Sequence, residues 1–144
     1  MTYRVYLDNC CFNRPYDDQS HLTTYLEAEA KLFVQRGILK GQFELAWSYI
    51  LDFENSVNPY EERKNTIADW RKIATVDINV SDEIVALGKT IMSKGVKKKD
   101  ALHIACAIKA NCDYFLTTDK KILNKEFSEI TVLNPLDLVR RLEV

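Results

Sequence analysis

The chain has 144 residues, enough for one domain (residues 1–144) that buries a core without disulfides or a structural metal. Its 20 Lys and Arg nearly balance its 21 Asp and Glu, for a formal net charge of −1, so bulk charge would not attract nucleic acid, and any such binding must be local. The opening MTYRVYLDN is unlike a signal peptide and no stretch approaches the roughly 18 apolar residues of a membrane span, so we expect a cytoplasmic protein without a membrane contact.

Strand-like and helix-like segments alternate along the chain. Residues 3–7 alternate as a short strand does, and a polar loop with Arg14-Pro15 and Asp17-Asp18 follows. Ser20 is placed to cap a helix that runs to about Arg36, with Gly37 as its stop. The later elements are a strand over 43–47, a helix from Ser48 to before Pro59, a helix over 61–72, a strand over 76–80, a helix from Ser81 to Gly95, the helix of KKKDALHIACA, a strand over 114–117, a helix over 119–127, a strand over 130–133 and a helix over 136–142.

This alternation predicts an α/β fold in which helices cover both faces of a parallel sheet. Consecutive parallel strands need crossover connections, and the helical segments supply them. In such sheets ligands bind beyond the carboxyl ends of the strands, at the point where the strand order reverses. Chemistry is therefore expected at that rim.

Three carboxylates are predicted to lie near this rim. Asp8 ends the first strand, and Asp119 follows the strand YFLTT and opens the next helix. Asp100 stands at the head of an apolar helix whose small Ala101 and Ala105 allow a close approach to the sheet. Helix capping is the ordinary explanation for Asp100 and Asp119, and taken singly each is explained as well by capping as by function.

The segment SYILDFENSV adds a fourth acid. At 100° per residue, its inward arc is defined by Ile50, Leu51, Phe53 and Val57. Glu54 falls inside that arc, whereas Asp52 falls on the opposite, solvated side. A buried Glu is costly unless it is paired or binds a cation. Glu54 is therefore the predicted functional acid of this helix.

Glu29 is a secondary candidate, because it shares a helical stripe with apolar residues. That stripe consists of Leu22, Tyr25, Leu26, Leu32 and Phe33. A role at the edge of the stripe, bonded to Arg, Lys or backbone, is favoured over a role in the site.

Four acids could thus meet in one crevice: Asp8, Glu54, Asp100 and Asp119. Carboxylates packed that closely repel one another and cannot all ionise without a cation. Hard oxygen ligands favour Mg²⁺ or Mn²⁺, and such ions activate water and stabilise charge on a phosphodiester. The set therefore predicts metal-dependent phosphodiester hydrolysis.

Four segments together make the chain resemble the PIN-domain family, the nuclease fold of VapC-type toxins. They are VYLDNCCF, WSYILDFENS, KKKDALHIACAI and YFLTTDKKIL, and they span nearly the whole chain. The resemblance implies a three-layer α/β/α sandwich and a metal-dependent endoribonuclease, the toxin of a toxin–antitoxin pair, with an antitoxin partner and a homodimer as further expectations. It carries the family's acids over to Asp8, Glu54, Asp100 and Asp119. Thr117 or Thr118 matches a hydroxyl residue that arranges the last acid, whereas Asn9 departs from the hydroxyl common after the first.

Several other side chains could contribute, each with an ordinary alternative. His103 is three residues after Asp100, and a satisfied, partly buried histidine is favoured over a catalytic one. Adjacent Cys10 and Cys11 are expected to be reduced and packed at a strand end, and no C-x-x-C spacing favours zinc. Basic residues near the acids are candidates for contacts with phosphates, and a solvated basic surface is the ordinary alternative. The candidates are Lys97, Lys98 and Lys99 and, more weakly, Arg14, Lys120 and Lys121.

Two other functions compete with the nuclease. A haloacid-dehalogenase-like phosphatase needs a second Asp two residues after the first, where this chain has Cys10. The other is a non-catalytic PIN-like module that binds RNA or a protein. The complete set of four acids argues against that module, because a site without chemistry has no need of buried carboxylates.

Overall fold

The computed structural model describes residues 2–13 and 20–142, and within them five parallel strands form one sheet. The strand order is β3-β2-β1-β4-β5, so the chain begins at the centre, moves outward to β3 and returns to the other side of β1. This confirms the predicted α/β fold. The strands are β1 (Tyr3–Leu7), β2 (Phe43–Ser48), β3 (Val76–Ile78), β4 (Tyr114–Leu116) and β5 (Thr131–Leu133).

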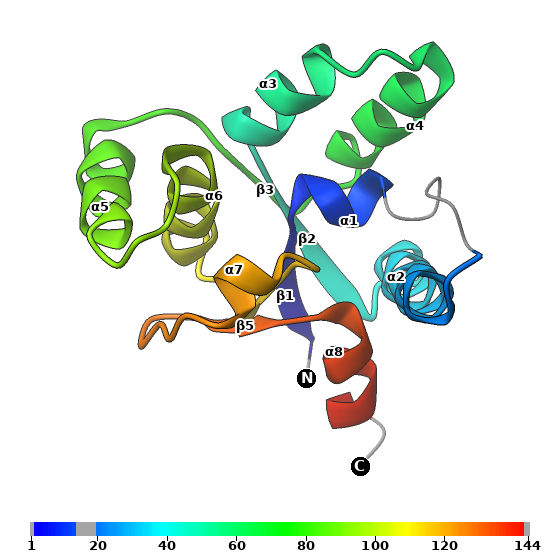
Figure 1. Ribbon diagram of the computed structural model, residues 1–144. Coiled ribbons are helices and arrows are strands. Elements are labelled where there is room, and N and C mark those ends of the chain that lie inside the picture. Colours follow the sequence, from blue (N-terminus) through cyan, green and yellow to red (C-terminus); the bar gives the residue numbers. More distant parts are fainter. Residues whose placement is uncertain (1, 14–19, 143–144) are drawn as a thin grey trace.

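Helices lie on both faces of the sheet, as the three-layer prediction requires. Figure 1 shows α5 and α6 to one side of the central strands and α2 to the other. The helices are α1 (Asn9–Asn13), α2 (Leu22–Leu39), α3 (Tyr49–Ser56), α4 (Glu61–Arg71), α5 (Asp82–Met92), α6 (Lys98–Lys109), α7 (Lys120–Leu123) and α8 (Pro135–Leu142).

The central strands carry the core, because a parallel sheet covered on both faces buries both sides of each strand. Tyr6, Leu45, Trp47 and Phe115 are fully buried. Ala101, Ala105 and other small residues of α6 are also buried, as expected for a helix that packs closely on the sheet. The strand ends above this core are therefore held rigidly, which suits them to position a site.

Most of the apolar stripe that Glu29 shares on α2 faces solvent. Leu22 is 71% exposed and Phe33 is 39% exposed. Glu29 is exposed on the same helix and does not join the acids described below. The buried face consists of Glu27, Ala28, Ala30, Lys31, Val34, Gly37 and Ile38.

Two charged residues are tolerated on the buried face of α2 because each has a partner. The Asn134 side-chain amide donates a hydrogen bond to Glu27 at 2.6 Å. The Lys31 ammonium lies 4.8 Å from the centre of the Phe12 ring. Partner groups of this kind offset much of the desolvation cost, so the face of α2 that carries Glu27 and Lys31 can pack inward.

Gly37 does not stop α2, which continues to Leu39. An ideal Cβ at this position would lie 2.5 Å from a ring carbon of Phe43, so the absent side chain makes room for the first residue of β2.

Two further expectations on local structure were wrong. Residues directly after β1 form the short helix α1 rather than a loop, and α7 is much shorter than the predicted helix over 119–127.

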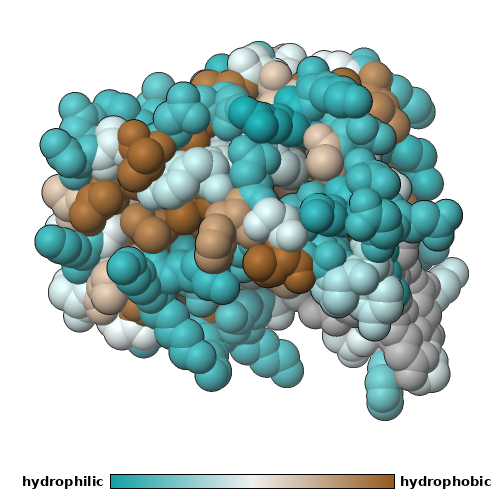
Figure 2. Space-filling view, turned by 90° about the horizontal axis from the view of Figure 1, so that it is seen from above, coloured by the Kyte–Doolittle hydropathy of each residue, from teal (hydrophilic) through white to brown (hydrophobic). Residues whose placement is uncertain are grey.

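Strand β1 runs upward in Figure 1, from the N-terminus toward α1, and Figure 2 views the molecule from above that end of the strand. Hydrophilic residues cover most of this face, with apolar residues in separate patches. Among the described residues, no helix is both long and apolar enough to cross a membrane.

Candidate metal centre

Asp8 lies directly beyond the carboxyl end of β1 and is only 6% exposed. Because β1 pairs with both β2 and β4, this is the point where the strand order reverses. The backbone N–H of Asn9 donates to one carboxylate oxygen of Asp8 at 2.8 Å, and the Thr117 hydroxyl donates to the other at 2.8 Å. These bonds fix Asp8 at the rim where the sequence predicted chemistry.

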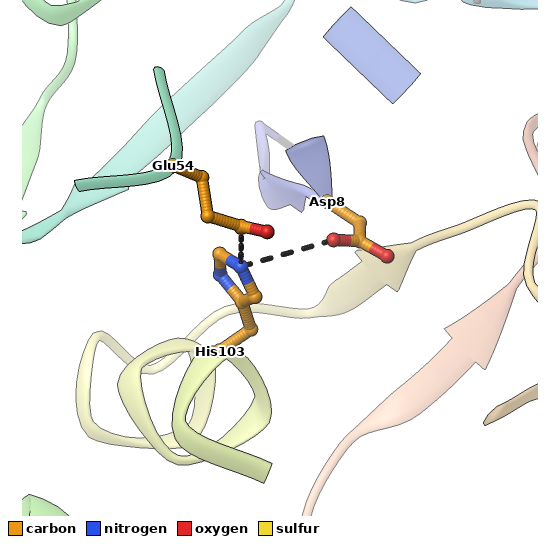
Figure 3. A group of neighbouring side chains, drawn as sticks. All are labelled: Asp8, Glu54 and His103. Carbon is orange, nitrogen blue, oxygen red and sulfur yellow. Dashed lines mark hydrogen bonds and ion pairs between the residues drawn. The ribbon is translucent and has the colours of Figure 1, made fainter. Parts of the chain in front are cut away.

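Glu54 and His103 converge on Asp8 from two helices. Figure 3 shows the three side chains pointing toward one another. The Nε2 atom of His103 is hydrogen-bonded to Oε1 of Glu54 and lies 3.9 Å from Oδ1 of Asp8. One ligand atom from each residue lies within 4.8 Å of the others, a spacing that could hold a metal ion.

The phase of α3 was only partly predicted. Ser48 caps the helix as expected, with its hydroxyl accepting from the backbone N–H of Leu51 at 3.4 Å. Glu54 is half-buried and directed into the cluster. Phe53 and Val57, however, are 57% and 69% exposed rather than inward. Glu54 is half-buried because it bonds His103, not because the whole predicted arc packs on the core.

Asp52 was predicted to be a solvated residue on the side away from Glu54, and its side chain is 40% exposed, but the structure also gives it two partners. Its carboxylate accepts a hydrogen bond at 2.9 Å from the indole nitrogen of Trp47, a residue that is fully buried. It also forms an ion pair with Arg71 at 3.4 Å. Asp52 therefore ties α3 to β2 and α4, away from the cluster of Glu54.

Asp100 is not the N-cap of its helix. The N-cap of α6 is Lys97, and Asp100 lies in the first helical turn. The Asp100 carboxylate lines a hollow together with Asp119, Lys97 and Lys121. The capping explanation therefore does not account for Asp100, although a negative charge still favours the start of a helix.

Asp119 does cap its helix, since its Oδ1 atom accepts from the backbone N–H of Lys121 at 2.9 Å. The Thr117 hydroxyl accepts from the backbone N–H of Asp119 at 3.1 Å while donating to Asp8. One hydroxyl thus links the first and the last of the predicted acids. Thr118, the alternative to Thr117, contacts the thiol of Cys10 instead, at 3.4 Å.

The electrostatics of the cluster favour a cation. Burial raises the pKa of the Asp8 carboxyl to about 8, with Cys10 and Asp100 adding to the shift and His103 and Thr117 opposing it. Burial also raises the pKa of Asp100, and repulsion from Asp119 and Glu54 adds to it. Each shift means that negative charge is disfavoured here without a compensating positive charge.

The three consecutive lysines predicted to contact phosphates lie in three different surroundings. Lys97 lines the hollow of Asp100 and Asp119, Lys98 lines a groove between α5 and α6, and the Lys99 ammonium lies 6.0 Å from the centre of the Phe53 ring. Lys121, a weaker candidate, shares the hollow with Lys97. Arg14 lies outside the described residues.

Two neighbours of the site carried no sequence prediction of a role there. Cys10, which was expected to pack at a strand end, has its thiol 3.5 Å from Asp8 and 3.6 Å from Thr117. Tyr6 contacts His103 through its hydroxyl at 2.6 Å. Tyr6 lies two residues before Asp8, so their side chains are expected on the same side of the extended chain, and this spacing was the only sequence signal for Tyr6.

The donor set fits Mg²⁺ or Mn²⁺. Asp8 and Glu54 offer carboxylate oxygens, the ligands that these ions prefer, and Asp100 and Asp119 line the adjoining hollow. The raised pKa values of Asp8 and Asp100 are the signature of acids that a bound cation would stabilise in their ionised form.

The fold and this cluster define an α/β protein with an acidic site at the switch point of a parallel sheet. The sequence model of the PIN domain matches residues 5–128, and the chain belongs to the PIN-domain family. Among curated proteins, none matches the chain.

A solved structure supports the same fold. A chain of the crystal structure of VapBC2 from Rickettsia felis bound to a DNA fragment from their promoter aligns with a TM-score of 0.55. The identity is 14%, and the alignment covers 91% of this chain and 98% of that chain. At this identity the likeness extends to the fold and does not by itself transfer an activity.

Proposed function

We propose that the protein is a divalent-metal-dependent endoribonuclease that hydrolyses RNA phosphodiester bonds. The observation that carries the proposal is the convergence of Asp8 and Glu54 at the end of the central strand, beside the hollow of Asp100 and Asp119. PIN-domain membership supports nuclease chemistry of this class.

In this proposal the four acids hold Mg²⁺ or Mn²⁺. Thr117 fixes the position of Asp8 relative to Asp119, because its hydroxyl is hydrogen-bonded to both residues. Such an ion supplies a nucleophile at neutral pH and stabilises negative charge on the phosphoryl oxygens. Lys97 and Lys121, in the same hollow, neutralise neighbouring phosphates of the RNA. The lysines together with the bound ion would supply the local positive charge that a chain of net charge −1 needs to bind an anionic substrate.

The test is cleavage of RNA by the purified protein. Cleavage should require Mg²⁺ or Mn²⁺, stop with EDTA and be lost in Asp8→Asn. Undiminished cleavage in EDTA would contradict a metal mechanism. RNA binding without cleavage under every metal condition would favour the alternative, a non-catalytic PIN-like module.

We further propose that the protein acts in the cytoplasm as the toxin of a toxin–antitoxin pair, with an antitoxin partner and as a homodimer. The fold shared with a chain of the VapBC2 structure supports the partnership. Co-expression with the product of an adjacent small reading frame should give a stable complex that no longer cleaves RNA. A neighbouring gene without such a product would favour a nuclease that acts alone.

A further inference from the structure

A continuous hydrogen-bond chain runs beneath the metal centre and ends on Glu54. The Ser48 hydroxyl lies 2.6 Å from the Tyr6 hydroxyl, which lies 2.6 Å from Nδ1 of His103, whose Nε2 is bonded to Glu54. Ser48 and Tyr6 are fully buried and His103 is 1% exposed. Water therefore cannot replace these partners, and each group depends on the next.

The chemistry of the end group sets the direction of this chain. An ionised carboxylate only accepts hydrogen bonds, so the Nε2 atom of His103 must carry the hydrogen that Glu54 accepts. In a neutral imidazole Nδ1 is then an acceptor, and the Tyr6 hydroxyl donates to it. Ser48 in turn donates to Tyr6.

Packing fixes the chain in place. The Tyr6 ring stacks on Phe115, with centroids 5.4 Å apart and planes at 12°, and meets the His103 ring edge-on at 5.6 Å. The chain also closes on α3, because Ser48 caps that helix and Glu54 lies on it. Strand β1 therefore connects to Glu54 through Tyr6 and His103, and Asp8 follows the end of the same strand.

We propose that His103 is a positioning residue, held by Tyr6 and Ser48 with its hydrogen on Nε2, which orients the Glu54 carboxylate toward Asp8 for metal binding. This inference rests on the proposed metal centre. It differs from direct ligation by His103, because an Nε2 atom that binds a metal carries no hydrogen. Groups that orient a ligand in this way typically change metal affinity about 10–100-fold when they are altered.

The first test reads the hydrogen position directly and needs no activity. The chain has two histidines, so ¹⁵N NMR of the imidazole rings, with His103→Asn used for assignment, separates His103 from His21. Hydrogen on Nε2 and an accepting Nδ1 are expected, without and with Mg²⁺, and Tyr6→Phe should shift the Nδ1 resonance. Hydrogen on Nδ1 alone, or loss of the Nε2 hydrogen when Mg²⁺ is added, would overturn the inference.

The second test measures Mn²⁺ affinity by calorimetry. The amide nitrogen of Gln reaches about the place of Nε2, whereas that of Asn reaches about the place of Nδ1, so only His103→Gln keeps a donor for Glu54. We expect His103→Asn and Tyr6→Phe to bind Mn²⁺ about 10-fold more weakly, with His103→Gln closer to the parent. Tyr114→Phe, on the adjacent strand β4, is the matched control and should bind like the parent.

Equal affinities in all these variants would overturn the role of His103 even if the parent binds Mn²⁺ and cleaves RNA. A parent that binds no Mn²⁺ would overturn the metal centre, and the role of His103 with it. Melting curves of each variant show whether a loss of affinity reflects a loss of folding.

Discussion

Asp52 and Glu54 lie two positions apart on α3 and should have different roles, one in stability and one in catalysis. Substituting each of them is the sharpest test of how the helix is oriented. Asp52 accepts from the buried indole of Trp47 and pairs with Arg71, whereas Glu54 is bonded to His103 in the cluster. Asp52→Ala should therefore lower stability and leave RNA cleavage in the folded protein intact. Glu54→Gln should abolish cleavage and leave stability nearly unchanged.

The size of the Asp52 effect follows from its contacts. Removing the acceptor leaves the fully buried Trp47 indole N–H without a partner, which costs about 1–3 kcal/mol. The Arg71 pair is about half exposed and adds little. We take the loss of unfolding free energy as about 2 kcal/mol and the unfolding entropy as about 2.1 cal/mol/K per residue over 144 residues. The Tm of Asp52→Ala should then fall by about 7 °C.

The assays are thermal melts in EDTA and initial rates of RNA cleavage below the melting transition. Loss of an orienting group costs about 10–100-fold, so loss of a ligand in Glu54→Gln should cost about 100-fold or more. Asp52→Asn keeps an acceptor for Trp47 and is the control, with parent-like cleavage and most of the stability. Comparable losses of cleavage for Asp52→Asn and Glu54→Gln would refute this orientation of α3.

Three further predictions concern charge. Asp100→Asn should melt in EDTA at or above the melting temperature of the parent, because the change removes repulsion with Asp119, and it should gain less stability from Mn²⁺ than the parent does. A clearly lower melting temperature in EDTA, with an equal gain from Mn²⁺, would mean that Asp100 is a structural residue. Burial raises the pKa of the Asp8 carboxyl from 3.8 to about 8. The folded state therefore binds more protons than the unfolded state in this range, and the contribution of Asp8 to stability falls as pH rises from about 4 to about 8. In EDTA the Tm of the parent should fall relative to that of Asp8→Asn over this range, and equal slopes would refute the shift. Lys97→Glu should raise KM for RNA and weaken the salt dependence of KM, whereas Lys98→Glu, in another groove, should do neither. Equal effects of the two substitutions would mean that RNA does not bind along the hollow.

The fold was largely predictable because strand and helix patterns are local. Ser48 and Ser81 cap helices as their sequence positions predict, and the alternation of elements leads directly to a parallel sheet. The orientation of α2 was not predictable, since it depends on partners distant in sequence. Glu27 is buried because Asn134 is there to bond it, and no pattern within α2 contains that information.

The site divides in the same way. Asp8 and Asp119 follow from the rule that parallel strands present their carboxyl ends to ligands. Glu54 was identified from a helical phase that proved only partly right, because Phe53 next to it is exposed. The contact between His103 and Tyr6 depends on how α6 lies on β1, and packing rather than residue type decides it.

A metal ion held by these acids should direct water onto a phosphodiester of RNA. The most direct measurement is cleavage of a defined RNA in H₂¹⁸O with Mn²⁺, followed by mass spectrometry of the product ends. We expect 5′-phosphate ends that carry one ¹⁸O, formed only when the metal is present and Asp8 is intact. Products that end in an unlabelled 2′,3′-cyclic phosphate would contradict it, because the attacking group would then be the ribose hydroxyl.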